Sequence, residues 1–165
     1  MPAPRRSLLV VAACVVALDQ VTKTWAVNAL DGGRTIDVVW TLRFALGFNS
    51  GMAFSKATGF GPVIGVVATV AVVWMLVSLR RADSFSSGLG IALVTGGAAG
   101  NLLDRMFRGP GWLRGSVVDF IDLQWWPVFN IADSAITVGG VILVAGALFM
   151  GDRGARHSTD AGGGA

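Results

Sequence analysis

The sequence predicts an all-α membrane protein with four transmembrane helices and one short strand-forming segment outside the membrane. Of the 165 residues, 53% are hydrophobic and only 14% are charged, which is more apolar than the core of a water-soluble domain of this size requires. Four apolar stretches are each long enough to cross a bilayer. The segment between the first two alternates apolar and polar residues, a period typical of strands.

The first apolar stretch follows Arg5 and Arg6 and covers residues 8–30. A basic pair before apolar residues is also the layout of a secretory signal, but here the apolar helix continues beyond Cys14. At 1.5 Å per residue the stretch reaches about 34 Å, enough for a membrane span. The other three predicted spans cover residues 57–79, 84–106 and 133–151.

An even number of spans places both termini on the same side of the membrane. Basic residues are equally numerous on the two sides, but those assigned to the cytoplasm lie in short flanks directly against the spans, where the positive-inside bias operates. We therefore predict a multi-pass protein with both termini inside. The cytoplasmic flanks contain Arg5, Arg6, Arg80, Arg81, Arg153 and Arg156, and residues 152–165 predict a disordered cytoplasmic tail after a single domain covering residues 1–151.

Residues 34–56 contain the segment with strand periodicity. One apolar face is expected to lie on the lipid surface or to pack on the spans. The segment could cap the helical bundle or contact a substrate, and the pattern leaves both open. Its apolar positions are Ile36, Val38, Trp40, Leu42, Phe44, Leu46 and Phe48.

Several functional classes are excluded by composition. The net charge of +3 arises from short arginine clusters, so a nucleic-acid partner is not expected. The single cysteine, Cys14, has no partner for an internal disulfide, and the single histidine, His157, lies in the glycine-rich tail. A metal site built from histidine and cysteine is therefore not expected.

Two predicted spans carry polar side chains that need partners in a membrane. Asp19 and Lys23 are four residues apart and lie on one helix face, where they can pair. Their spacing favours a structural ion pair over a direct catalytic role. On the third span, one helix face carries small and polar residues, which suggests a hydrogen-bonded network toward the bundle interior. These residues are Gly97, Gly100, Asn101 and Asp104, with Arg105 adjacent.

Asp119 and Asp133 are the candidate catalytic pair. All ten acidic residues are aspartates, and Asp119 lies between apolar neighbours, where a lone carboxylate has no evident structural purpose. Asp133 opens the fourth span, and both it and Asn130 could instead cap that helix. Two carboxylates brought together cannot both ionise, so the pair would hold one proton near neutral pH, a state suited to peptide hydrolysis.

The motifs together resemble the lipoprotein signal peptidases, or signal peptidase II, which are aspartic proteases of the bacterial inner membrane. The blocks occur in the family's order and cover residues 8–150. The chain departs from the family pattern in a lengthened loop over residues 105–115 and a short connection between the two aspartates. The matching blocks are Asp19-Gln-Val-Thr-Lys23, Asn49-Ser-Gly51-Met-Ala-Phe54, Gly97-Ala-Ala-Gly100-Asn101-Leu-Leu-Asp104-Arg105, Val117-Val-Asp119-Phe120 and Phe129-Asn130-Ile-Ala-Asp133-Ser134.

This resemblance implies an endopeptidase that removes the signal peptide from diacylglyceryl-modified prolipoproteins, cutting before the lipidated cysteine without a metal or cofactor. It implies a monomer among membrane lipids, with residues 34–56 forming an extracytoplasmic β-cradle and the active site near the extracytoplasmic face. Asp119 and Asp133 match the catalytic dyad. Residues matching the network around the dyad and substrate are Asp19, Lys23, Asn49, Gly51, Asn101, Asp104, Arg105 and Asn130.

Two hypotheses from other classes remain open at the level of sequence. A small transporter or proton-conducting protein could use the intramembrane Asp19 and Lys23 as a relay. However, a relay requires ionisable groups through the depth of the bundle, whereas most acids here gather at its outer edge. A structural four-helix subunit would tolerate substitution of both candidate catalytic aspartates.

Overall fold

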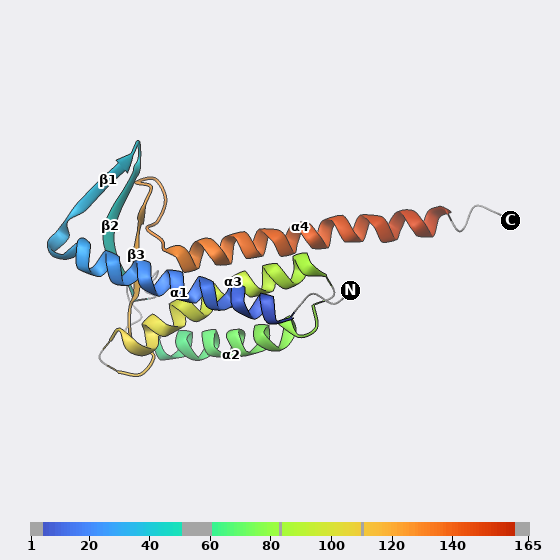
Figure 1. Ribbon diagram of the computed structural model, residues 1–165, viewed down its shortest axis with the longest axis horizontal. Helices are drawn as coiled ribbons and strands as arrows, with labels where there is room; N and C mark the ends of the chain where they lie inside the picture. The colour runs from blue at the N-terminus through green and yellow to red at the C-terminus, as the bar shows by residue number, and fades with distance from the viewer. Residues whose placement is uncertain (1–4, 51–60, 83, 110, 161–165) are drawn as a thin grey trace.

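The computed structural model describes residues 5–50, 61–82, 84–109 and 111–160. Four α-helices lie side by side in this part of the chain, and a three-stranded sheet crosses one end of them (Figure 1). The helices are α1 (Arg5–Ala29), α2 (Gly61–Leu79), α3 (Phe85–Phe107) and α4 (Ile131–Asp160). The strands are β1 (Thr35–Val39), β2 (Leu42–Asn49) and β3 (Val117–Asp122).

Three of these helices are long and apolar enough to cross a membrane. They are α1 over Arg6–Ala29, α2 over Pro62–Leu79 and α4 over Ile131–Phe149. The helix α3 is long enough at 23 residues, but its glycine, serine and polar residues make it less apolar than the other three. The prediction of a mostly helical membrane protein is thus supported, whereas the fourth span stays a prediction.

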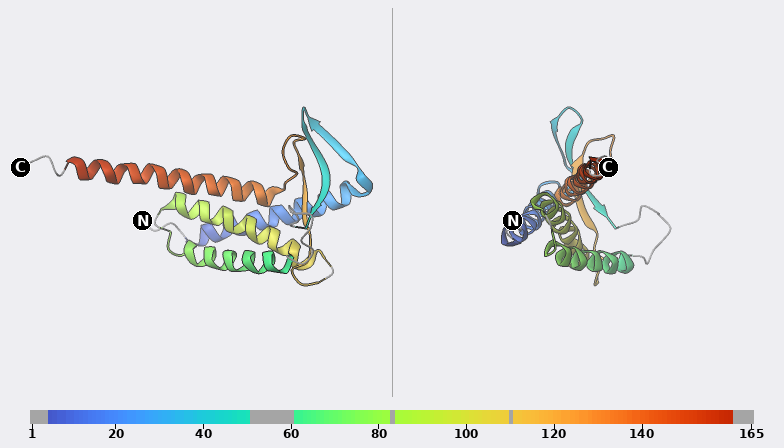
Figure 2. Two further views of the ribbon diagram at one scale, coloured as in Figure 1. Left: turned by 180° about the vertical axis from the view of Figure 1, so that it is seen from behind. Right: turned by 90° about the vertical axis from the view of Figure 1, so that its right-hand side faces the viewer.

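The helix α3 lies at the centre of the bundle and packs against α1, α2 and α4 (Figure 2, right). Its glycines allow the close approach. Gly96 faces the backbone of Ala12 in α1, and Gly90 faces the backbone of Gly139 in α4. Gly97 likewise faces the carbonyl of Ala132 at the start of α4. The polar content that lowers the hydropathy of α3 is therefore covered by its neighbours.

The outward faces of α2 and α4 are apolar. Val67, Val70 and Trp74 of α2 are each more than 60% exposed, as are Val141 and Leu148 of α4. Such a continuous apolar surface would be unfavourable in water, and it is the expected surface of helices surrounded by lipid.

The sheet is antiparallel with strand order β1-β2-β3. The edge strand β1 is exposed along its whole length, whereas β3 is buried against the bundle. Phe120 of β3 contacts Ala26 of α1 and Leu30 directly after it, and its ring lies 6.1 Å from those of Trp25 and Phe44. This aromatic cluster fixes the sheet to the end of α1. Of the predicted strand region, residues 51–56 lie outside the described part of the chain.

Two expectations about chain segments need correction. The sequence predicts a single strand-forming segment, within residues 34–56, but residues 117–122 form a further strand, β3, which is buried against the bundle. Because both faces of β3 are buried, its sequence lacks the contrast between an apolar and a polar face that identified β2. The predicted disordered tail is also shorter than expected, since α4 continues to Asp160. No proline interrupts residues 131–160, so backbone hydrogen bonding can continue past the apolar stretch.

The neighbouring glycines 139 and 140 of α4 offer a test of the helix packing. A Cβ atom at Gly139 would lie 2.7 Å from the carbonyl oxygen of Gly90, whereas one at Gly140 would meet nothing within 4 Å. We expect Gly139→Ala to lower the free energy of unfolding by about 1–3 kcal/mol through overpacking. Gly140→Ala should leave it unchanged or raise it. Thermal unfolding in detergent micelles measures both, and equal melting temperatures would contradict the packing of α3 on α4.

Candidate active site

Asp119 lies on β3 at the junction between the sheet and the bundle, and only 4% of its surface is exposed. Its position in the sheet is opposite Gly47 of β2. Asn49, two residues further along β2, is a diagonal neighbour on the same face, and its side chain hydrogen-bonds to the Asp119 carboxylate. The pairing of β2 with β3 therefore brings Asn49, from the second matching sequence block, to Asp119, the first candidate catalytic residue.

Asp133 lies in the first turn of α4, where it forms a reciprocal cap with Asn130. The backbone N–H of Asp133 donates to Asn130 Oδ1 at 2.9 Å, and the backbone N–H of Asn130 donates to Asp133 Oδ2 at 3.2 Å. This is the geometry of a capping box with Asn at the N-cap. The capping role that the sequence left open for these residues is therefore present.

The same Asn130 also links the two candidate catalytic carboxylates. Its side-chain Nδ2 donates to Asp119 Oδ1 at 2.6 Å while its backbone N–H holds Asp133. On the other side, Asn101 Nδ2 of α3 donates to Asp133 Oδ1 at 2.8 Å. The side chains of Asp119 and Asp133 thus share one buried hydrogen-bonded group, although fourteen positions separate them in the sequence.

Burial, and after it the negative charge of Asp133, together raise the pKa of Asp119 from 3.8 to about 6. Hydrogen bonds from Asn130 and Asn49 and the positive charge of Lys23 oppose this change. The rise means that Asp119 holds its proton well above the pH at which an exposed aspartate would lose it. A carboxylic acid and a carboxylate can therefore coexist in this site.

Lys23 is the central cation beneath the pair, and it is completely buried. Its ammonium group lies 2.9 Å from Asp19 Oδ2 and 2.9 Å from Asp104 Oδ2, and it donates to Asn101 Oδ1 at 2.8 Å. Three partners match the three N–H donors of an ammonium group. The Asp19–Lys23 pair predicted from the spacing is present, and its partners extend to α3.

The two aspartates that neutralise Lys23 also hold the backbone on either side of the candidate dyad. Asp19 Oδ1 accepts from the backbone N–H of Ala132, next to Asp133, at 3.0 Å. Asp104 Oδ2 accepts from the backbone N–H of Val118, next to Asp119, at 3.1 Å. The start of α4 and the strand β3 are thereby tied to one buried charge cluster.

Arg105 differs from Lys23 and Arg108 because its side chain forms no ion pair with Asp104. Asp104 Oδ1 instead lies 2.9 Å from Arg108 Nε, one helical turn further on. The guanidinium of Arg105 interacts electrostatically with Asp119 and Asp104, and its buried Nη1 atom has no hydrogen-bond partner. The backbone carbonyl of Arg105 accepts from Gly115 N–H and closes the lengthened loop.

The structure therefore collects nearly all the predicted site residues in one region, but Gly51 lies outside the described residues. Sequence reasoning missed Gln20 and Arg108. Arg108 is four residues after Asp104 on the same helix, so the spacing used for Asp19 and Lys23 could have found it. Gln20 donates to Asp104 Oδ1 at 3.1 Å and to the carbonyl of Gly100, contacts that only the packing of α1 on α3 creates.

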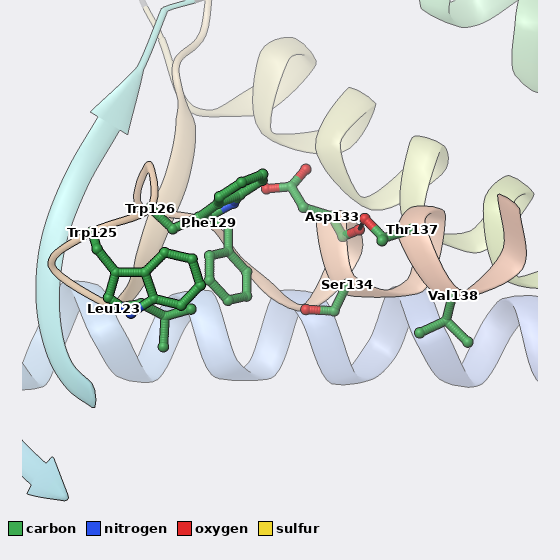
Figure 3. A pocket seen from close by; sticks show the side chains of 8 residues that line it. All are labelled: Leu123, Trp125, Trp126, Phe129, Asp133, Ser134, Thr137 and Val138. Carbon is green, nitrogen blue, oxygen red and sulfur yellow. Dashed lines mark hydrogen bonds between the residues drawn. The ribbon is translucent and has the colours of Figure 1, made fainter. Parts of the chain in front are cut away.

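An apolar groove of about 470 Å³ opens beside Asp133. Leu123, Trp125, Trp126 and Phe129, from the segment before α4, form one wall, and α4 from Asp133 to Val138 forms the other (Figure 3). Among the described side chains, no group of three or more His, Cys, Asp or Glu residues is arranged to hold a metal ion.

The chain is similar to bacterial peptidases over most of its length. The family model described as signal peptidase (SPase) II matches residues 11–149. A lipoprotein signal peptidase of Mycolicibacterium smegmatis is 49% identical over 145 residues, which is 87% of this chain and 62% of that protein. One of Mycobacterium leprae is 45% identical over 149 residues, which is 90% of this chain and 74% of that protein. The chain thus spans less than two thirds of the first of these relatives.

Solved structures share the fold described above. One described as a bacterial membrane enzyme superposes with a TM-score of 0.74 at 28% identity, covering 86% of this chain and 87% of the other. A second with the same description gives a TM-score of 0.70 at 29% identity and covers 86% and 92%.

The buried cation can be tested by Lys23→Ala. This change leaves the buried Asp19 and Asp104 carboxylates without their shared ammonium group, so the free energy of unfolding should fall by about 3–5 kcal/mol. Arg81→Ala, which removes an exposed charge at the far end of α2, should change it by less than about 0.5 kcal/mol. Melting in detergent compares the two variants, and similar values would argue against the charge cluster.

The pKa of Asp119 predicts a pH-dependent effect on stability. Between pH 3.8 and about 6 the folded protein keeps a proton that the unfolded chain releases, so the free energy of unfolding falls as the pH rises through this window. Asp119→Asn removes this penalty, and we expect it to stabilise the protein by up to about 3 kcal/mol at pH 8 relative to its effect at pH 4. Melting curves at the two pH values measure the difference. An equal effect at both would show that Asp119 titrates normally.

Proposed function

Because the chain belongs to the signal peptidase II family, we propose that it removes the signal peptide from diacylglyceryl-modified prolipoproteins by cleaving the bond before the lipidated cysteine. The substrate class rests on the names of its relatives, which are lipoprotein signal peptidases. The same names give no support to the transporter or proton-relay alternative.

The single observation that favours an aspartic mechanism is the placement of two carboxylates on either side of Asn130. Asp119 comes from β3 and Asp133 from α4, and Asn130 contacts both. The raised pKa of Asp119 suits it to carry the proton that the pair shares. Asp133 accepts two N–H hydrogen bonds, one from Asn101 and one from Asn130, an environment suited to a carboxylate.

In the proposed reaction, the Asp133 carboxylate removes a proton from water as the water oxygen attacks the scissile carbonyl carbon. Asp119 gives its proton to the carbonyl oxygen, which produces a tetrahedral diol. Asp133 then protonates the amide nitrogen of the lipidated cysteine, the C–N bond breaks, and a diol hydroxyl returns its proton to Asp119. The products are a signal peptide with a free carboxylate and a lipidated cysteine with a free amine.

The remaining polar residues are proposed to position the dyad and the substrate. Asp19, Lys23, Asn101 and Asp104 form the buried base on which the dyad rests. Arg105 is a candidate for substrate contact because its Nη1 atom is buried and has no partner. A buried donor of this kind is costly unless a ligand accepts from it.

We further propose that α3 is the fourth membrane span and that the protein lies in the bacterial inner membrane with both termini in the cytoplasm. The start of α1 and the end of α4 both lie opposite the sheet (Figure 1), so one side of the membrane accommodates both. The sheet and the dyad then face the extracytoplasmic side. Lipidated substrates anchored in that leaflet reach the dyad from the bilayer.

Substitution of the dyad tests the proposed chemistry. We expect Asp119→Asn and Asp133→Asn each to reduce cleavage of a lipobox peptide bearing a diacylglyceryl group by at least about 10³-fold, because either change removes a proton-transfer step. Asp37→Asn on the exposed strand β1 is the matched control and should retain full activity. The assay uses purified protein whose folding is checked by its melting curve. Turnover by a folded Asp119→Asn protein would rule out the dyad.

A further inference from the structure

The groove beside Asp133 has two features that the peptidase chemistry alone does not explain. Its walls are mainly apolar, and its aromatic wall contains two large exposed rings, Trp125 and Trp126, which are 70% and 58% exposed and contact each other edge to face. Along α4 the groove ends at Val138, and the exposed apolar surface that includes Val141 begins one turn further on. The groove therefore connects the candidate dyad directly with the surface that faces lipid.

The aromatic wall is held in place from the sheet. Arg43 Nε of β2 lies 2.8 Å from Asp122 Oδ2, and Asp122 Oδ1 accepts from the backbone N–H of Gln124 at 2.6 Å. Gln124 Nε2 also donates to the carbonyl of Thr41 in the β1–β2 turn at 2.9 Å. Gln124 adopts a left-handed backbone conformation with φ of 68°, which the contacts on both sides of it stabilise. These contacts fix the position of the aromatic wall relative to the sheet.

We propose that this groove binds an acyl chain of the substrate's diacylglyceryl group while the peptide bond is cleaved. This assignment rests on the proposed function. The diacylglyceryl group is attached to the residue directly after the scissile bond, so its chains must lie next to the dyad and still reach the bilayer. The groove meets both requirements, since Asp133 lines it (Figure 3) and its α4 wall ends at Val138, beyond which the exposed apolar face of α4 continues.

The chemistry of the walls favours an acyl chain over an extended peptide. A peptide strand carries an N–H and a C=O group at every residue, and each is costly to bury without a hydrogen-bond partner. The groove is lined mainly by carbon, from the side chains of Leu123, Trp125, Trp126, Phe129 and Val138. An acyl chain has no polar groups to satisfy, and every methylene that it buries in the groove favours binding. The tryptophans suit the interfacial depth at which the glyceryl group lies.

The test compares two lipobox peptides that differ only in their diacylglyceryl chains, one dipalmitoyl and one dihexanoyl. Val138→Trp fills the groove, and Trp125→Ala removes part of its aromatic wall. We expect both variants to lower the ratio of kcat/KM for the long-chain peptide to that for the short-chain peptide by at least about fivefold, which corresponds to loss of one or two buried methylenes. Each variant's ratio is compared with the ratio for the unsubstituted protein, so differences in how the two substrates enter the micelle cancel.

Val141→Trp is the matched control, since it makes the same change on the same exposed face of α4, one turn beyond the groove. Its ratio should equal that of the unsubstituted protein. If Val138→Trp slows both peptides equally, the groove holds a signal-peptide helix, and an unchanged ratio with unchanged rates leaves only a bilayer lipid as its occupant. Either result overturns the assignment. Failure of the proposed function is distinguishable, because the unsubstituted protein would then cleave neither peptide.

Discussion

The buried ammonium group of Lys23 is the interaction on which the candidate site depends. Its removal from water is favourable only because Asp19, Asp104 and Asn101 satisfy it completely. Each aspartate also accepts a hydrogen bond from the backbone of another element. Asp19 uses its second oxygen, Oδ1, for the Ala132 N–H of α4, whereas Asp104 Oδ2 contacts both Lys23 and the Val118 N–H of β3. One cation therefore determines how four elements meet, and the two carboxylates of the candidate dyad lie directly beside the points where that backbone is held.

Asn130 combines a structural and a chemical role. As the N-cap of α4 it satisfies a backbone donor that would otherwise be unpaired, a contribution of about 1 kcal/mol to helix stability. Through its Nδ2 it also holds the Asp119 carboxylate. In the sequence, capping α4 and belonging to the site were alternative roles for Asn130. In the folded protein Asn130 has both roles. The same side chain sets where the helix starts and how far the two carboxylates lie from each other.

The parts of the structure that could be predicted from the sequence are those governed by local spacing. Hydropathy located α1, α2 and α4, alternation located β2, and the spacing of Asp19 and Lys23 identified their pair. Contacts between distant segments could not be predicted in this way. The strand β3 pairs with β2 across about seventy residues, and Gln20 finds its partners only because glycines of α3 let α1 approach. The resemblance of short motifs to a known family supplied this missing information, since it grouped distant residues that lie together in the folded protein.

The low hydropathy of α3 has a consequence for how the protein enters the membrane. Asn101 and Asp104 would each be costly in lipid if α3 inserted alone, and Asp19 and Lys23 impose a similar cost on α1. The two helices carry complementary halves of one charge set, so each lowers the insertion cost of the other. With α3 as the proposed fourth span, we therefore expect insertion and assembly of these two helices to be coupled. In the proposed topology, a chain that ends before α3 would present the Asp19–Lys23 pair to the bilayer without its partners Asn101 and Asp104.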